Sequence, residues 1–335
     1  MRPKTPLQQT VAKSGLGLEC AFPSDELRAV FGSQCGVVEA ESVGRGVPAA
    51  TAGVWLVRAA SDAAVLKLVH HDPGGNHRWP ADADPAHPYY WRREVCAYES
   101  KLLERLPGIR APRCRGLFER ADGSFALWLE AFPETAWSID GYGRAARNLG
   151  QMQGASAGAL PTERWLSRRW LRAYLDLRQE VTGPRSRKWE AMLDSVEAGP
   201  QTFCHLDFYP GNLFGDGDVT ILIDWAYCGI GALGEDPGNF VPDAILDGYV
   251  AAELGAELER AVWNGYRAGL ADAGWAGDER AVRFAFCATP WLKFGWLDAA
   301  IGSDTIDEAT ATRWQGARPL IDRLGEEARE LASSR

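Results

Sequence analysis

Four polar residues between Phe203 and Gly229 have types and a spacing that could do chemistry. They follow the pattern H-x-D-x(4)-N-x(11)-D and are His205, Asp207, Asn212 and Asp224. The stretch reads FCHLDFYPGNLFGDGDVTILIDWAYCG, with several aspartates and no lysine or arginine. Carboxylates this dense repel one another unless a positive group neutralises them. Asp and Asn side chains supply hard oxygen ligands, which suit Mg²⁺, and Mg²⁺ usually takes further ligands from water and phosphate. The pattern therefore predicts Mg²⁺ and, with it, a nucleotide.

This arrangement fits the template of phosphoryl transfer. In that template a loop Asp accepts the proton of the attacking hydroxyl, a loop Asn binds metal, and a later Asp bridges the metal to the phosphates. We therefore expect Asp207 to be catalytic, and Asn212 and Asp224 to be metal ligands. His205 fits a brace for the loop better than a proton acceptor, because the template gives the proton to the Asp. Taken alone, Asp207 and Asn212 could also be ordinary turn residues.

The template also requires a strand lysine and a helix glutamate earlier in the chain. Lys67 lies within the apolar run AAVLKLV, and Glu94 lies in the helical segment WRREVCAYES that follows. A lysine inside an apolar strand is costly unless it is paired, although Lys67 could also snorkel from a strand edge. The small-residue segment GRGVPAATAG could cover phosphates with backbone N–H groups, or it could be an ordinary hairpin loop. The agreement of these features in type, order and spacing favours a kinase.

The elements that must position these residues form two lobes. The alternating segment GVVEAESV and the strand-like segments VWLVRA and AAVLKLV that follow it predict an antiparallel meander. YYWRREVCAYESKLLERL predicts a helix, and RGLFERADGSFALWLEAF predicts a hairpin. Helical patterns then dominate, over 140–158, 164–181, 243–274 and 306–332. We expect an α+β fold with an N-terminal ATP-binding lobe over 1–132, of which 1–20 is a flexible tail. A helical catalytic and substrate-binding lobe is expected over 133–335.

Composition narrows the class of protein. A chain of 335 residues suits two lobes better than one core. The sequence has no window of about 18 uninterrupted apolar residues, so we expect no membrane span. Its start lacks the apolar region of a secretory signal. The net charge of −9 argues against nucleic acid as the main partner. The seven cysteines are odd in number and widely spaced, which predicts reduced thiols and a cytoplasmic location.

The motifs quoted above resemble those of the aminoglycoside phosphotransferase and choline kinase group, a branch of the protein-kinase-like fold. CHLDFYPGNLF resembles the catalytic loop of that group, and ILIDWAYCGIGALGEDPGNF resembles its metal-binding Asp segment. The resemblance covers roughly residues 36–250. It implies transfer of the γ-phosphoryl group of ATP with Mg²⁺, and contact of Lys67, oriented by Glu94, with the α and β phosphates. It also implies that LWLEAF is a hinge that binds adenine through backbone atoms near Glu130 and Phe132, although Glu130 could simply end a strand.

The acceptor is less determined than the reaction. Only about ten residues separate Asp224 from GEDPGNF, which leaves no room for an activation segment with its A-P-E anchor. This spacing favours a small-molecule kinase, and by resemblance the acceptor is an amine-bearing antibiotic, an amino sugar or an amino alcohol. One alternative is a kinase that phosphorylates Ser or Thr of a ribosomal peptide during natural-product maturation. Another is a non-catalytic nucleotide-binding scaffold, which would have no need of all four residues Lys67, Asp207, Asn212 and Asp224.

An acidic run continues past these residues. From 201 to 259 the chain has eleven Asp or Glu and no Lys or Arg, and four of the acids are Glu235, Asp236, Asp243 and Asp247. Some of them are expected to line the acceptor site, where they would attract a cationic small molecule. The alternative is that Asp236 caps a turn and the others are solvated. Three tryptophans of the helical half could line a substrate cleft or pack in the core: Trp170, Trp291 and Trp296.

Overall fold

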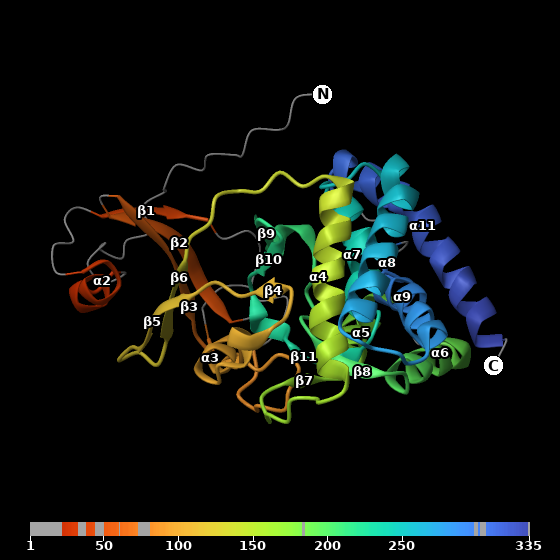
Figure 1. Ribbon diagram of the computed structural model, residues 1–335, viewed down its shortest axis with the longest axis horizontal. Coiled ribbons are helices and arrows are strands. Elements are labelled where there is room, and N and C mark those ends of the chain that lie inside the picture. The colour runs from red at the N-terminus through yellow and green to blue at the C-terminus, as the bar shows by residue number, and fades with distance from the viewer. Residues whose placement is uncertain are drawn as a thin grey trace. The chain divides into compact units, whose positions relative to one another are not determined.

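The chain folds into two compact units. The structure is a computed structural model, and it describes residues 22–32, 38–43, 50–59, 61–72, 81–182, 185–297, 301 and 306–333. The first unit comprises the described residues up to 81 together with 112–132, and the second comprises 82–111 with those from 133 onward (Figure 1). The tail expected over 1–20 and most of the segment GRGVPAATAG lie outside the described residues.

The first unit is built on a five-stranded antiparallel sheet, as the sequence predicts. Its strand order is β1-β2-β3-β6-β5. The strands are β1 (Val38–Ser42), β2 (Thr51–Ala59), β3 (Asp62–Val69), β5 (Cys114–Glu119) and β6 (Phe125–Glu130). Lys67 pairs in register with Val54 of β2 and with Leu127 of β6. It therefore lies on a central strand, which excludes the edge position that snorkelling from an edge would need.

A short helix that the sequence did not predict, α2 (Ser24–Phe31), packs on this sheet. Its Val30 joins Trp128 and other sheet residues in the core of the unit. The buried carboxylate of Glu26 accepts hydrogen bonds of 2.8 Å from Arg120 and from Nε1 of Trp128. An eight-residue helix cannot be stable alone, so this packing and the buried ion pair hold it in place.

The helix predicted over 89–106 is shorter than expected. It comprises α3 (Arg93–Glu99) and a separate 3₁₀ turn, η1 (Leu102–Arg105). Between them Lys101 has a left-handed backbone, with φ of 59°. A non-glycine residue in this region ends a right-handed helix, and the chain then enters strand β4 (Ile109–Arg110).

Two three-stranded sheets of the second unit carry the stretch that holds the four polar residues. One has the order β4-β10-β9, with β9 Leu213–Asp216 and β10 Val219–Leu222. The other has the order β7-β11-β8, with β7 Ser167–Arg168, β8 Gln201–Cys204 and β11 Gly229–Ala232. The 3₁₀ turn η2 (Pro210–Asn212) connects β8 to β9, and η3 (Trp225–Tyr227) connects β10 to β11. Both turns therefore lie at strand ends, where the four side chains can converge.

Helices make up most of the second unit (Figure 1). They are α4 (Ile139–Ala157), α5 (Trp170–Thr182), α6 (Arg187–Glu197), α7 (Glu235–Leu246), α8 (Gly255–Asp272), α9 (Glu279–Lys293) and α11 (Glu308–Ser333), with the 3₁₀ turn η4 (Ala252–Leu254) before α8. The helix predicted over 243–274 is thus divided, because Gly248 adopts φ of 79° just after α7. Within the described ranges, no helix has the length and apolar character that crossing a membrane requires.

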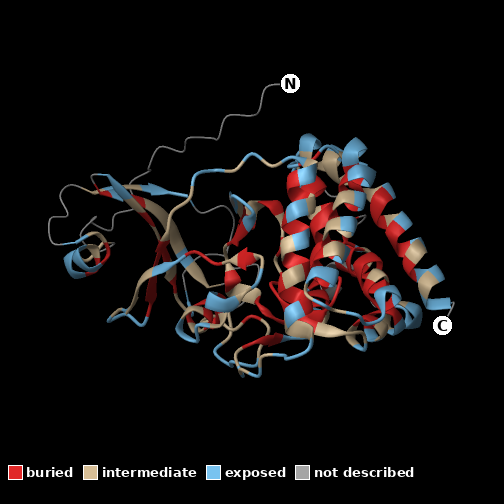
Figure 2. Cartoon of the chain, viewed as in Figure 1, coloured by how far each residue is buried: buried red, intermediate tan, exposed pale blue. Residues whose placement is uncertain are grey.

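Helices α4 and α8 pack with their backbones in close contact. A Cβ atom on Gly265 would lie 2.0 Å from the carbonyl oxygen of Gly143, and one on Gly269 would lie 1.9 Å from that of Arg147. Glycine at these positions lets the two helices approach closely enough to bury their facing sides. Figure 2 shows buried residues on one side of α4 and exposed residues on the other.

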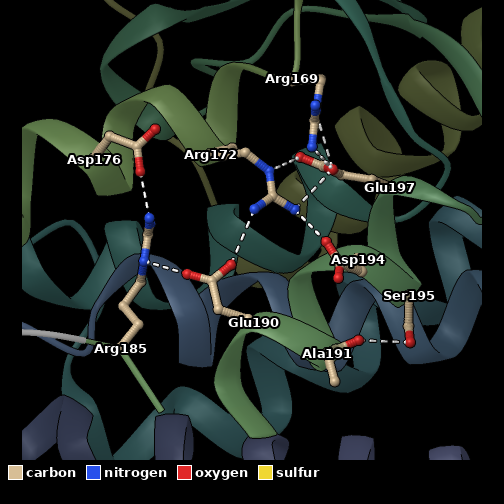
Figure 3. Close-up of polar contacts among 9 residues, drawn as sticks. All are labelled: Arg169, Arg172, Asp176, Arg185, Glu190, Ala191, Asp194, Ser195 and Glu197. Atoms are coloured by element: carbon tan, nitrogen blue, oxygen red, sulfur yellow. Dashed lines mark hydrogen bonds and ion pairs between the residues drawn. The ribbon is translucent and has the colours of Figure 1, made fainter. Parts of the chain in front are cut away.

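Charged side chains fix α5 and the chain just before it to α6 (Figure 3). Arg172 contacts three carboxylates of α6, at 3.0 Å to Glu190, 2.6 Å to Asp194 and 2.8 Å to Glu197. Arg169 also reaches Glu197, at 2.7 Å. Isolated surface ion pairs contribute little, but a network that shares one arginine restrains several side chains at once. The α5–α6 hairpin is therefore firmly joined.

Candidate active site

The turn after β8 brings Asp207 and Asn212 together. The amide nitrogen of Asn212 donates to the backbone oxygen of Asp207 at 2.9 Å and to its carboxylate oxygen Oδ2 at 3.1 Å. The 3₁₀ turn closes with a 3.0 Å hydrogen bond from the Asn212 backbone N–H to the carbonyl of Tyr209. Because the amide nitrogen makes both side-chain contacts, the amide oxygen is left as the atom that could bind a cation.

Asp224 lies at the end of the neighbouring strand, where the 3.0 Å hydrogen bond from Ile223 N–H to the Asn212 carbonyl joins the two segments. Its backbone is left-handed, with φ of 62°, a strained conformation that is common at functional sites. Burial, and next the charge of Asp224, raise the pKa of Asp207 to about 7. The two carboxylates are therefore close enough to repel each other. A cation bound between them would relieve this repulsion.

The donor set here suits a hard divalent cation that also binds phosphate. Asn212 and Asp224 offer oxygen ligands of the kind that Mg²⁺ prefers. Across the described ranges, no cluster of three or more His, Cys, Asp or Glu is arranged to hold a metal ion by itself. A cation at Asn212 and Asp224 would therefore need additional oxygens, which phosphate and water supply.

His205 is buried and holds the loop to strand β10. Its Nε2 lies 3.0 Å from the backbone carbonyl of Ile223 and so donates to it. Its ring packs edge-on against Trp225, with 4.7 Å between centroids. These contacts support the role of a brace, since a ring nitrogen that donates to a carbonyl is not available to accept a proton.

Asp236 holds the catalytic loop through partners that the sequence did not indicate. Its carboxylate accepts hydrogen bonds of 2.8 Å from the backbone N–H groups of His205 and Leu206, and of 2.8 Å from the side chain of Gln153. Leu206 has a left-handed backbone, with φ of 65°, which these bonds stabilise. Asp236 is buried, as is Glu235, which accepts from Ala232 N–H at 3.2 Å. Asp236 thus caps the turn of the catalytic loop, as one of the two expectations had it, and its carboxylate is held inside the protein rather than in solvent.

The positive group beside the acidic run comes from another helix. The ammonium of Lys293, at the end of α9, donates to Asp243 of α7 over 2.8 Å. Lys293 is only 8% exposed, and its positive charge lowers the pKa of Asp207, which burial raises. Asp243 is thus not solvated. No local signal in the sequence could have joined two residues so far apart.

The neighbouring residues Arg93 and Glu94 tie α3 to the segment after Asp224. Glu94 is buried, and its Oε1 accepts from the backbone N–H of Trp225 at 3.3 Å. Arg93 is fully buried and donates to the backbone carbonyls of Trp165 at 2.7 Å and Ala226 at 3.2 Å. Sequence reasoning missed Arg93, because its binding partners are backbone atoms that leave no pattern of residue types.

The remaining predicted site residues belong to the first unit. Lys67 is 6% exposed on β3, and its pairing with Glu94 stays a prediction. Glu130 ends β6, where its backbone N–H donates to the carbonyl of Arg113 at 2.9 Å and its carboxylate binds the Arg113 guanidinium at 3.3 Å. The N–H of Glu130 is thus occupied, and the adenine contact expected from backbone atoms near Glu130 and the half-buried Phe132 stays a prediction.

Comparison with known families agrees with this geometry. The model of the phosphotransferase enzyme family (APH) matches residues 49–279, which include Lys67, Glu94 and all four polar residues of the loop. The chain belongs to this phosphotransferase family. The match covers more than half of the sequence and confirms the resemblance that the motifs indicated. No curated protein matches the chain.

Solved structures share the fold at low sequence identity. An amicoumacin kinase in complex with AMP-PNP, Ca²⁺ and Ami has a TM-score of 0.55 and 14% identity, over 87% of this chain and 88% of that one. A microcompartment-associated aminopropanol kinase has a TM-score of 0.52 and 16% identity, over 90% and 97%. Choline kinase from Cryptosporidium parvum Iowa II has a TM-score of 0.52 and 12% identity, over 89% and 90%. At these identities the likeness shows the fold, which is the two-lobed protein-kinase-like fold predicted from the sequence.

Membership of the family makes this protein an enzyme that transfers a phosphoryl group to an alcohol group of a small molecule. The work asked of the protein is positioning and charge neutralisation rather than covalent chemistry. The hydrogen-bonded pair Asp207–Asn212, beside the charge of Asp224, has the form that this work requires.

Proposed function

We propose that this phosphotransferase uses Mg²⁺ and ATP to phosphorylate a hydroxyl of an amine-bearing small molecule, namely an antibiotic, an amino sugar or an amino alcohol. The observation that carries the proposal is the contact of Asn212 with Asp207 at 3.1 Å, in a loop where the charge of Asp224 acts on the same carboxylate. The similar structures named above include an amicoumacin kinase bound to AMP-PNP and an aminopropanol kinase, which supports ATP and an amine-bearing acceptor.

Each proposed role follows from the chemistry of the side chain. Asp207 orients the acceptor hydroxyl and takes its proton, because it is the loop carboxylate with a raised pKa. Asn212 and Asp224 hold Mg²⁺, which neutralises charge on the transferred group. Lys67, oriented by Glu94, contacts the α and β phosphates. Backbone atoms near Glu130 and Phe132 hold adenine; these last two roles come from the family resemblance.

An amine on the acceptor would find carboxylate and aromatic groups near the catalytic loop. Asp247 follows α7, and burial together with the neighbouring charge of Asp243 raises its pKa to about 6. The rings of Trp170 and Tyr227 lie 5.7 Å apart. A cation over an aromatic face is stabilised by about 0.5–2 kcal/mol. The other acids of the run that were expected near the acceptor have internal partners: Glu235, Asp236 and Asp243. Asp247 is therefore the acid of the run that we propose attracts a cationic acceptor.

The experiment that tests this function is a screen of Mg²⁺-dependent ATP consumption. The panel contains aminoglycosides, choline, ethanolamine, aminopropanol, amino sugars and Ser- or Thr-containing peptides, with the Asp207→Asn variant as the matched control. Turnover with an amine-bearing alcohol, lost in the variant, supports the proposal. Turnover with peptides alone would show a peptide kinase, and nucleotide binding without any turnover would show a scaffold. The cytoplasm remains the proposed location, on the cysteine pattern of the sequence alone.

A further inference from the structure

A cavity of about 250 Å³ lies among the helices of the second unit. Its walls come from α5, α6, α9, α11 and the chain beside them, and four are large aromatic side chains: Trp189, Trp291, Phe294 and Trp296. The residues that line it include none of the catalytic loop. Concave sites with aromatic walls and a few polar groups are the usual form of small-molecule sites.

The aromatic walls are held in place before any ligand binds. The indole of Trp291 lies directly against α11, since a Cβ atom on Gly325 would lie 2.2 Å from its ring. Trp296 packs edge-on against Trp314, with 5.2 Å between ring centroids. The backbone N–H of Trp189 is capped by Ser186 Oγ at 3.3 Å. Walls that are already fixed lower the entropy cost of binding a rigid ligand.

Two hydrogen-bond donors in the walls have no acceptor among the described residues. Nη1 of Arg185 and Nε1 of Trp296 are buried and have no hydrogen-bond partner within the residues that the structure describes. A buried donor left unsatisfied costs about 1–3 kcal/mol. A ligand oxygen that accepts from either donor would recover part of this free energy, so these donors favour a ligand that bears oxygen acceptors.

The charges of the walls are already neutralised. Arg185 contacts the carboxylate of Asp176 and lies 2.7 Å from that of Glu190 (Figure 3). Arg318, also in the lining, lies 3.0 Å from Asp322. The cavity therefore offers donors without a net positive charge, which suits a neutral ring with hydroxyl, carbonyl or ether oxygens better than an ammonium or a strong anion.

The volume limits what can enter. An apolar cavity of about 150 Å³ holds a benzene molecule, so a cavity of about 250 Å³ has room for a two-ring system. Sites that enclose a whole drug-sized ligand are usually larger, about 300–1,000 Å³. The cavity therefore fits one part of a ligand whose remainder lies elsewhere.

A row of aromatic side chains leads from this cavity toward the catalytic residues. The guanidinium of Arg178 lies 4.4 Å from the ring of Trp296 and 5.3 Å from that of Tyr174. Tyr174 stacks on Trp170 at 5.2 Å, and Trp170 lies 5.7 Å from Tyr227.

The far end of this row lies beside the catalytic carboxylates. Burial, and next the charges of Asp207 and Asp224, raise the pKa of Tyr227. At the cavity end, Leu292 and Phe294 of the lining flank Lys293, whose charge acts on Asp207. Contacts among four rings and one guanidinium thus run from the cavity to Tyr227, on which the charges of Asp207 and Asp224 act.

We propose that this cavity is a specificity pocket for the acceptor, which binds a neutral, planar, oxygen-bearing ring remote from the hydroxyl that is phosphorylated. The proposal rests on the proposed function for the identity of the ligand as an acceptor. The existence of a ring-binding pocket does not depend on it, and the two are tested by different measurements.

The pocket itself is tested by calorimetric titration of the full-length chain with 2-naphthol, without nucleotide. We expect binding of one molecule per chain, and at least tenfold tighter binding than that of the cation 2-naphthylmethylammonium. Trp296→Phe keeps a ring but removes the donor, and should weaken 2-naphthol binding at least fivefold; Trp189→Leu should weaken it as well. The control Trp275→Phe changes a half-buried indole between α8 and α9, outside the lining, and should leave the affinity unchanged.

The link to the reaction is tested by kinetics with the acceptor that the ATP-consumption screen identifies. We expect 2-naphthol to compete with the acceptor and not with ATP, and Trp296→Phe to raise the acceptor KM more than it lowers kcat, as loss of remote binding requires. The pocket is wrong if 2-naphthol fails to bind, binds the Trp296→Phe and Trp189→Leu variants as well as the parent, or binds more weakly than the cation. If 2-naphthol inhibits non-competitively with the acceptor, the acceptor does not occupy this cavity. Absence of turnover with every acceptor would sink the proposed function, while the titration would still decide the pocket.

Discussion

The ammonium of Lys293 lies 2.8 Å from Oδ2 of Asp243, although 50 positions separate the two residues in the chain. Their side chains are only 10% and 19% exposed. The acidic run from 201 to 259 contains no cation of its own, so α9 supplies one to α7. The pair therefore joins two helices of the second unit and places a positive charge among the acids around Asp207.

The first prediction concerns this ion pair. Lys293→Met should lower the free energy of unfolding by about 3 kcal/mol, because it leaves the carboxylate of Asp243 buried without its partner. Urea denaturation of the full chain, followed by circular dichroism, measures the change. The double variant Lys293→Met with Asp243→Asn should recover most of the loss, since no unpaired charge remains. A cost below about 1 kcal/mol for the single variant would mean that water already solvates Asp243.

Turnover should depend on Asp207 far more than nucleotide binding does. Asp207→Ala removes the proposed base and positioning group, and should lower kcat by several orders of magnitude. The proposed metal ligands Asn212 and Asp224 remain, so calorimetry should find Mg²⁺·ATP affinity within a few-fold of the parent. Near-parental kcat in this variant would exclude the role assigned to Asp207.

For Asp224 we expect the opposite pattern, in which nucleotide binding itself is weakened. Asp224→Asn replaces a charged metal ligand with a neutral one, and should weaken Mg²⁺·ATP binding at least tenfold. The same titration without Mg²⁺ is the control, because there the substitution should make little difference. If the Mg²⁺-dependent part of the affinity is unchanged, the metal lies elsewhere.

The proposed pairing of Lys67 with Glu94 predicts a shared loss. Lys67→Met removes a phosphate contact, and Glu94→Gln removes the charge that would orient it, so each should lower turnover at least tenfold. If the two residues act through one pair, the double variant should lose little more than the worse single variant. If the two losses of turnover multiply in the double variant, Glu94 acts instead through its hydrogen bond to Trp225.

Much of the fold could be predicted because its signals are local. Alternation of apolar and polar residues predicted β1, short strand-like apolar segments predicted β2 and β3, and the turn ADG predicted the β5–β6 hairpin. Among the helices, α4 and α11 had long regular patterns and were predicted nearly to their ends, over 140–158 and 306–332. Short helices such as α2 were missed, because their stability comes from packing rather than from a repeat long enough to recognise.

In the candidate site, too, local patterns could be recognised in the sequence and contacts between distant residues could not. Residue types at fixed spacing are the basis on which Asp207, Asn212 and Asp224 are proposed as site residues. The residues that hold the loop in shape were missed or misjudged, because they are distant in sequence: Asp236 accepts from His205 N–H, and Lys293 pairs with Asp243. An isolated carboxylate in an acidic run looks solvated until the partner that buries it is known.

Glu235 and Asp236, at the start of α7, are two adjacent buried acids with different partners. Asp236 accepts three hydrogen bonds from N–H groups, which favour its ionised form and oppose the effect of burial. Glu235 accepts from Ala232 N–H. Burial, and next the charge of Asp236, raise the pKa of Glu235 to about 8. We therefore expect Glu235 to stay protonated in the folded protein at neutral pH.

The sign of the resulting pH dependence follows from proton binding. An unfolded glutamate has a pKa of about 4.3, so between that pH and about 8 the folded protein binds one proton more than the unfolded chain. The stabilisation is fully present below the unfolded pKa and is lost as pH rises through the folded pKa. Glu235→Gln mimics the protonated acid at every pH, so its stability relative to the parent should increase by on the order of 1 kcal/mol per pH unit from about 5 to 8. Urea denaturation of both proteins from pH 5 to 9 measures this difference, with Glu253→Gln, at an exposed position of η4, as the control that should show no such trend. A difference between Glu235→Gln and the parent that stays constant across this range would mean that Glu235 titrates alike in the folded and unfolded states.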